Sequence, residues 1–104
     1  TLNVSQESRM NWPFDQAKNV AAVTTQQVMR HGLPVLSVVH YSDDDSWAFT
    51  CGTSNDSADL MLVGMEEVVS TDSTLFGIAD LPPGWRASRS KVGGDWVRYE
   101  DNDI

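Results

Sequence analysis

The chain has 104 residues, of which 40% are hydrophobic, and four of them are tryptophans. This size and composition are typical of one folded domain and exclude an intrinsically disordered chain. The formal net charge is −8, and the span from His31 to Trp85 contains nine acidic residues and no Lys or Arg. An acidic surface repels phosphate backbones, so we expect no nucleic-acid partner.

The same charge distribution has two interpretations. An acidic face attracts a basic protein partner and speeds its encounter. It can also serve only to keep a protein in solution. The sequence leaves both interpretations open.

Cys51 is the single cysteine, so the chain forms no internal disulfide. A lone cysteine favours a reducing compartment, and we therefore predict a cytoplasmic protein. No apolar run approaches the roughly 18 residues that a membrane-spanning helix needs, so we expect no membrane partner. We expect a flexible N-terminal tail over 1–11, a single domain over 12–100 and a C-terminal tail over 101–104.

The first part of the domain predicts a short strand followed by a short helix. Trp12-Pro13-Phe14 predicts an extended segment whose two aromatic rings pack on the core. The small and β-branched residues 19–24 predict a strand. Thr24 or Thr25 then caps a helix that ends at Gly32, because glycine accepts the left-handed conformation found just beyond a helix.

A β-hairpin is predicted next. The apolar run Pro34–Tyr41 predicts a central strand that is buried on both faces. Residues 42–46, "SDDDS", predict a turn, and Trp47–Gly52 predicts the return strand. Alternation along the return strand places its bulky side chains on one face of the sheet.

The second half predicts a strand, two helical segments and a second pair of strands. Residues 59–64 predict the strand, helical periodicity begins at Met65, and Asp72 is placed to cap a second short helix over 74–79. The last two strands flank the turn at Gly93-Gly94. We therefore predict an α+β domain with a mostly antiparallel sheet of about five strands and two helical segments packed on one face.

The stretch Leu81–Gly84, "LPPG", predicts a sharp turn from helix into strand, because proline fixes φ and glycine permits positive φ. In the strand that follows, Trp85, Ala87 and Arg89 share one face, and we interpret Trp85 as a core anchor. We expect Arg86 or Arg89 to reach a carboxylate, either within the chain or on a partner. Internal carboxylates are favoured, since the chain has 15 acidic residues and 7 Lys and Arg.

The residue types that carry chemistry form no recognisable catalytic arrangement. Cys51 with His31 or His40 comes nearest to a nucleophile pair, but Cys51 lies on the apolar face of a predicted strand. Glu66 and Glu67 are adjacent on a helix, so their carboxylates point apart. We predict a non-enzymatic protein with no cofactor and no metal.

The acidic turn is the strongest candidate for a binding element. It lacks the glycine and the distal glutamate of a calcium loop, so it is either an ordinary solvated turn or a tip that binds a basic partner. The candidate partner-binding residues are His40, Asp43, Asp44, Asp45, Trp47, Arg86 and Arg89.

These residues carry a resemblance to a known group of proteins. The stretches "LPVLSVVHYSDDDSWAFTCG", "STDSTLFGIADLPPGWRASR" and "DWVRYE" resemble a family of small uncharacterised bacterial proteins that is grouped with the immunity proteins of polymorphic toxin systems. The matching positions are His40, Asp43, Asp44, Asp45, Trp47, Phe49, Asp72, Leu75, Asp80, Leu81, Pro82, Gly84, Ala87, Arg89 and Trp96. The resemblance implies a cytoplasmic protein that binds and neutralises a toxin. It supplies no catalytic residues.

Three hypotheses about function follow. The first is an immunity-like binding module that masks a basic, toxin-like protein with its acidic hairpin. The second is a small-ligand-binding domain or enzyme whose pocket is lined by Trp47, Trp85, Trp96 and Arg89. The third is an accessory domain with no activity of its own.

Overall fold

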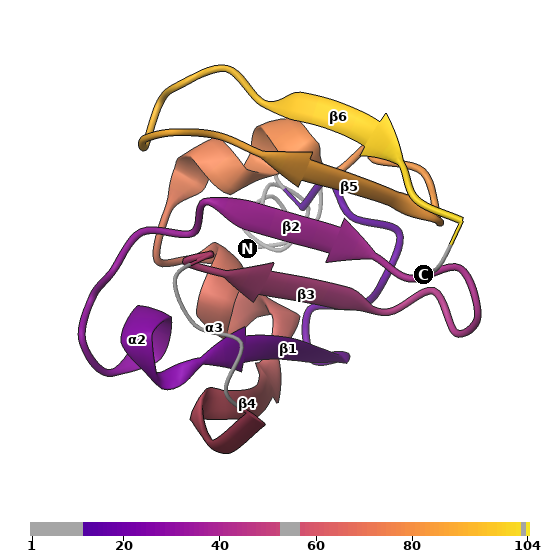
Figure 1. Cartoon of the computed structure of the whole chain (residues 1–104). Helices are drawn as coiled ribbons and strands as arrows, with labels where there is room; N and C mark the ends of the chain where they lie inside the picture. Colours follow the sequence, from indigo (N-terminus) through magenta and orange to yellow (C-terminus); the bar gives the residue numbers. More distant parts are fainter. Residues whose placement is uncertain (1–11, 53–56, 103) are drawn as a thin grey trace, which may run out of the picture.

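The computed structural model describes residues 12–52, 57–102 and 104 as a sheet with short helices (Figure 1). The sheet has six strands in the order β4-β1-β3-β2-β5-β6. Their bounds are β1 Ala21–Thr25, β2 Ser37–His40, β3 Trp47–Thr50, β4 Leu60–Gly64, β5 Trp85–Ser88 and β6 Val97–Glu100. Neighbouring strands pair antiparallel, except for β1 and β3, which pair parallel. The predicted α+β fold with a mostly antiparallel sheet is confirmed, with six strands rather than about five.

The β2–β3 hairpin forms the centre of the sheet, as the apolar run and the acidic turn predict. Val38 pairs with Phe49 and His40 pairs with Trp47. The turn residue Asp45 has a φ of 62°, a left-handed conformation that Asp tolerates better than most residues do. This conformation closes the turn and sets the register of the two strands.

In the described part of the chain, four short helical segments lie between strands. They are α2 Gln26–Met29, η1 Ser57–Asp59, α3 Met65–Val69 and η2 Ser73–Ile78, and η1 and η2 are 3-10 helices. Thr25 caps α2 by accepting a hydrogen bond from the N–H of Val28. Asp72 caps η2 by accepting from the N–H of Thr74, as its spacing predicts.

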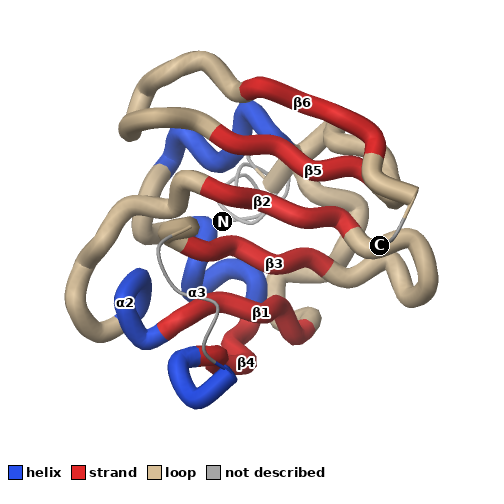
Figure 2. The backbone as a smooth tube through the Cα atoms, viewed as in Figure 1, coloured by secondary structure: helices blue, strands red, loops and turns tan. Residues whose placement is uncertain are grey.

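One face of the sheet is covered by α3 and η2, which lie behind the strands in Figure 2. The core lies between these layers, and its members include Val38, Trp47, Phe49, Met65, Val68, Val69, Leu75, Ile78 and Leu81. Phe14, from the segment before β1, adds an edge-to-face contact with Trp47 at 5.1 Å. The predicted extended aromatic segment therefore contributes to the core.

The turn before β5 differs in one respect from the sequence expectation. Leu81 is fully buried, whereas Trp85 is only partly buried and packs against the edge of the core. Alternation correctly places Ala87 and Arg89 on the covered face, where both are buried. The anchor of this turn is therefore Leu81, which is fully buried, whereas Trp85, the first residue of β5, is only partly buried.

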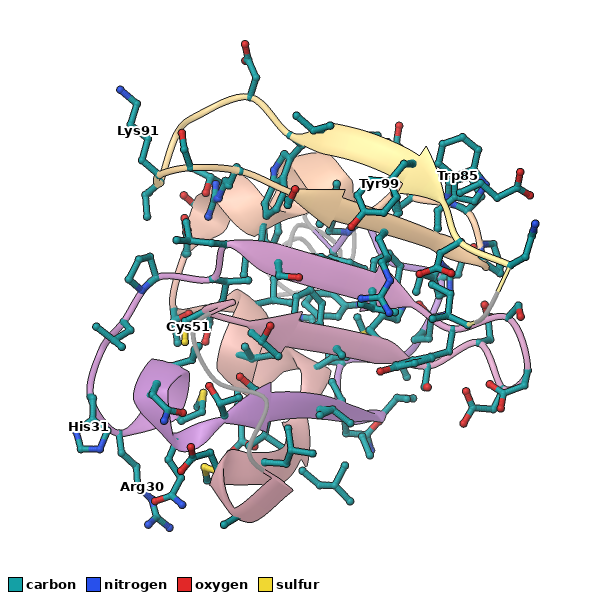
Figure 3. All side chains as sticks on the ribbon, viewed as in Figure 1. Arg30, His31, Cys51, Trp85, Lys91 and Tyr99 are labelled. Atoms are coloured by element: carbon teal, nitrogen blue, oxygen red, sulfur yellow. The ribbon has the colours of Figure 1, made fainter. Side chains whose placement is uncertain are left out.

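The opposite face of the sheet faces the viewer in Figure 3, where Tyr99 lies on it. The strand register places four large side chains on this face. Their exposed fractions are 50% for Leu60, 73% for Leu62, 63% for Val97 and 46% for Tyr99. Only short side chains such as Ala48 lie at its centre, where β3 pairs with β2. Within the described residues, α3 and η2 pack on the other face.

The chain remains attached to the sheet beyond β6. The N–H of Asp101 donates to the carbonyl of Gly84 at 2.8 Å, which extends the β5–β6 ladder by one pair. The Ser42 hydroxyl donates to the carbonyl of Ile104. The expected N-terminal tail, 1–11, lies outside the described residues.

Candidate functional site

The acidic turn is held in place by a buried histidine at the end of β2. The Nε2 atom of His40 lies 2.7 Å from Oδ1 of Asp45, and its Nδ1 atom lies 2.7 Å from the carbonyl oxygen of Leu81. The imidazole also stacks on the indole of Trp47, with ring centroids 4.0 Å apart. His40 therefore joins the hairpin tip to the turn before β5.

Gln16 is a second clamp on the hairpin, and it comes from the segment before β1. Its side-chain amide donates to both the carboxylate and the backbone carbonyl of Asp45, at 3.0 and 3.1 Å. Its side-chain carbonyl accepts from the indole N–H of Trp47 at 2.9 Å. Two separate parts of the chain thus fix the position of Asp45.

Asp44 stabilises the turn from within. Its carboxylate accepts hydrogen bonds from the hydroxyl and the backbone N–H of Ser46, at 2.6 and 3.1 Å. These bonds, the hydroxyl bond first, lower the pKa of the Asp44 carboxyl below its ordinary value. Asp44 therefore stays ionised to lower pH than an ordinary aspartate.

A hollow of about 280 Å³ lies beside this turn. Three carboxylates from separate segments line it: Asp15, Asp45 and Asp80. The other lining residues are Gln16, His40, Trp47, Ala79, Leu81, Pro82 and Pro83. A second hollow shares Asp15 and Asp80 and extends to Phe76. The lining therefore combines negative charge with apolar and aromatic walls.

The sequence indicates the tip of this site but not its other wall. His40, Asp43, Asp44 and Asp45 gather in the hairpin as expected, and Asp43 is exposed at its tip. Trp47 is buried and forms part of the hollow. Asp15, Gln16 and Asp80 join the site only through the tertiary fold, so no local pattern indicates them.

The two candidate arginines form internal ion pairs. Arg86 pairs with Asp101 at 2.5 Å. The side chain of Arg89 is 0% exposed, and it pairs with Asp72 at 2.7 Å. Both arginines therefore pair with carboxylates of this chain, which is the alternative that the excess of acidic residues favours.

Several further contacts occupy the Arg89 guanidinium. It donates to the carbonyl of Val35 and to the hydroxyl of Thr74, and it stacks at 4.3 Å on the ring of Trp96. Trp47, by contrast, packs on Phe14, Phe49 and His40. Trp47, Trp85 and Trp96 all pack into or against one core, but Trp47 lines the hollow beside the hairpin and the other two do not.

The structure places the other candidate chemical groups apart. Cys51 is buried in the core, and both ring nitrogens of His40 face other partners. His31 is exposed after α2 and points away from Cys51 (Figure 3). Among residues 12–52, 57–102 and 104, no group of three or more His, Cys, Asp or Glu is placed to hold a metal ion. No helix in this part of the chain has both the length and the apolar character needed to cross a membrane.

Comparison with known proteins adds no relative. Searches against protein-family models, curated proteins and solved structures find no match to this chain.

Proposed function

We propose that this protein is a non-enzymatic binding module that masks a basic protein partner with its acidic hairpin tip and the adjoining hollow. The observation that supports this most is the grouping of five aspartates at one end of the molecule: Asp15, Asp43, Asp44, Asp45 and Asp80. The tip is the part of the site that the sequence already indicates. The hollow beside it has room for a side chain of the partner.

Preorganisation supports a binding role over a simple solvating one. Asp45 is held by His40 and by Gln16, and Asp44 is held by Ser46. A tip that is already ordered loses little conformational entropy when it binds, so more of the interaction energy appears as affinity. The Asp44–Ser46 contact is common in aspartate turns, so the support comes from His40 and Gln16, which hold Asp45 from outside the turn.

Charge complementarity sets the chemistry of the partner. A lysine or arginine side chain in the hollow meets the carboxylates of Asp15, Asp45 and Asp80, and its aliphatic stem meets Leu81 and Pro82. Arg98 already neutralises part of the charge of Asp80, because its guanidinium donates a hydrogen bond to the Asp80 carboxylate at 2.7 Å. Of the three carboxylates in the hollow, Asp80 is therefore already paired with an arginine of this chain.

The resemblance to immunity proteins of polymorphic toxin systems agrees with this proposal, because many toxins act on nucleic acid and carry basic active sites. We propose a cytoplasmic location on the same basis, together with the lone Cys51. Masking requires tight association and no turnover. The protein therefore binds its partner without changing it chemically.

A quantitative capture experiment tests the proposal. Immobilised protein is compared with the variant Asp43→Asn/Asp44→Asn, using lysate of the source organism at low and high salt. Asparagine can still accept the hydrogen bonds from Ser46, so the variant loses two charges and keeps its turn. We expect a basic protein that is retained by the wild type at low salt and released at high salt, and that the variant retains poorly.

The matched control removes the same charge from elsewhere on the surface. Glu66→Gln/Asp95→Asn changes two exposed acidic residues outside the lining of the hollow. This control is expected to retain the partner as the wild type does. Equal loss in both variants, or capture of no basic protein, would contradict a site at the hairpin tip.

A further inference from the structure

Strand β6 is one end of the sheet, and its outer edge faces away from β5 in Figure 1. Bonded and non-bonded pairs alternate along an antiparallel ladder. The N–H of Asp101 donates to the carbonyl of Gly84, so Arg86–Tyr99 and Ser88–Val97 are also bonded pairs. The backbone groups of Tyr99 therefore face β5, and those of Arg98 and Glu100 face outward.

Arg98 and Glu100, whose backbone groups face outward, are two positions apart and carry opposite charges. Both side chains lie on the face of the sheet that the helices cover, since they alternate with Val97 and Tyr99. This spacing is self-complementary. When two such edges run antiparallel about Tyr99, Arg98 of each lies opposite Glu100 of the other.

We propose that β6 pairs with β6 of a second copy of this chain. The two strands run antiparallel about a twofold axis at Tyr99 and join two six-stranded sheets into one. Arg98 and the partner's Glu100 form a bonded pair on each side of the axis. Between them, Tyr99 faces the partner's Tyr99 as a close non-bonded pair on the uncovered face.

Three observations select this occupant. Opposite charges directly across an antiparallel strand pair stabilise it, and like charges destabilise it. The proposed register places Arg98 opposite Glu100. A shift by two residues would place Arg98 opposite Arg98, or Glu100 opposite Glu100, and is therefore disfavoured. Val97 and Tyr99 continue the exposed apolar face across the axis, where aromatic pairs add to the stability. The opposite edge strand, β4, carries no charged residue between Leu60 and Gly64. Charge pairing therefore selects no partner register at that edge.

The internal contacts of Arg98 are compatible with this pairing. Its guanidinium donates to Asp80 at 2.7 Å and to the carbonyl of Gly77 at 2.9 Å. A guanidinium has five N–H donors, so donors remain for the partner's Glu100. The net charge of −8 on each copy opposes association, and added salt screens that repulsion. The short interface therefore gives a concentration-dependent dimer, and salt screens both this repulsion and the Arg98–Glu100 attraction.

Charge reversal tests the register directly. Arg98→Glu places two glutamates opposite each other, and Glu100→Arg places two arginines opposite each other, so each variant is expected to be monomeric by analytical ultracentrifugation. An equimolar mixture of the two restores opposite charges at both pairs and is expected to form a heterodimer. The double variant Arg98→Glu/Glu100→Arg is expected to regain the homodimer.

The control Asp80→Asn removes the internal ion pair of Arg98 and leaves the edge charges unchanged, so it is expected to dimerise as the wild type does. Circular dichroism of every variant establishes that the monomers are folded. A wild type that stays monomeric up to about millimolar concentration, or single variants that dimerise as well as the wild type, would overturn the proposal.

A cross-link reports the twofold axis independently of charge. Non-bonded pairs in antiparallel strands bring Cα atoms to about 4.5 Å, within the range that a disulfide spans. Tyr99→Cys is therefore expected to form a covalent dimer under mild oxidation, whereas the wild type, whose Cys51 is buried, does not. Failure of Tyr99→Cys to cross-link faster than Val92→Cys, a loop residue away from the axis, would also contradict the pairing.

Discussion

His40 and Asp45 are five residues apart, and their side chains meet across the β2–β3 turn at 2.7 Å. The imidazole is nearly inaccessible, with a side-chain exposure of 6%, whereas the Asp45 side chain is 59% exposed. One end of this contact therefore lies in the core and the other on the surface. Through it, the buried layer fixes the position of an acidic side chain that a partner can reach.

Replacing the histidine tests this coupling. His40→Phe keeps an aromatic ring that can stack on Trp47 but removes the ring nitrogens that contact the Leu81 carbonyl and the Asp45 carboxylate. We expect a loss of about 1–3 kcal/mol in the free energy of unfolding, measured by urea denaturation. Hydrogen exchange of residues 42–46 is expected to accelerate in the variant. Unchanged exchange at the turn would show that His40 does not hold it.

Asp45 also has a backbone role, because its φ is 62°. Asp45→Asn keeps an acceptor side chain and a residue that tolerates the left-handed region, so its melting temperature is expected to stay close to that of the wild type. Asp45→Val loses the acceptor and puts a β-branched residue in this conformation, which costs about 1–3 kcal/mol. Differential scanning calorimetry distinguishes the two variants, and equal melting temperatures would contradict this account of the turn.

The Arg89–Asp72 pair is the second contact that joins distant segments, here the end of β5 and the start of η2. Removing one member of a buried ion pair leaves the other uncompensated, so Arg89→Met is expected to lose about 3–5 kcal/mol in unfolding free energy. The loss in Arg89→Met/Asp72→Asn is expected to be smaller than the sum of the two single losses. An additive double-mutant cycle would show that the two side chains do not interact.

Acid stability is expected to depend on Asp72. Partial burial raises the pKa of its carboxyl, but hydrogen bonds from Thr74 and the contact with Arg89 outweigh burial, and the pKa is lowered overall. A carboxyl with a lowered pKa in the folded state contributes stability that is full above its ordinary pKa. This contribution is lost as the pH falls through the lowered value.

Urea denaturation between about pH 5 and pH 2 measures this contribution. The wild type is expected to lose stability over this range more steeply than Asp72→Asn, whose side chain does not titrate. Parallel curves for the wild type and Asp72→Asn would contradict the lowered pKa.

Trp47 and Trp85 differ in how much they support the fold. Trp47 is 1% exposed and packs on His40, Phe14 and Phe49, so Trp47→Ala is expected to lose about 3–5 kcal/mol. Trp85 is partly buried, so Trp85→Ala is expected to lose clearly less in the same urea titration. A larger loss for Trp85→Ala would restore the expectation, drawn from its alternating strand, that Trp85 is the main anchor.

Local patterns predict much of this fold. The apolar run and the acidic turn indicate the β2–β3 hairpin, and the spacing of Thr25 and Asp72 indicates two helix starts. These features depend on neighbours in sequence, which a single chain displays. The parallel pairing of Val23 with Ala48 depends on a crossover through α2 and β2, and no local pattern encodes it.

The candidate site shows the same limit. The hairpin acids are visible as a run, but Asp15 and Asp80 are single residues in unrelated loops that the fold brings to one hollow. Alternation assigns Trp85 and Ala87 to the correct face, yet it does not indicate how far the helical layer extends over that face. Exposure at the ends of strands is therefore the property that the sequence predicts least well.

The most direct test of the acidic-tip account is the dissociation constant of the captured partner, measured by isothermal titration calorimetry at several salt concentrations. The account predicts that Asp43→Asn/Asp44→Asn weakens binding at least about tenfold at low salt and flattens the salt dependence. Glu66→Gln/Asp95→Asn is predicted to bind as the wild type does. Equal affinities for the wild type and the tip variant would contradict the account and place the binding surface elsewhere on the molecule.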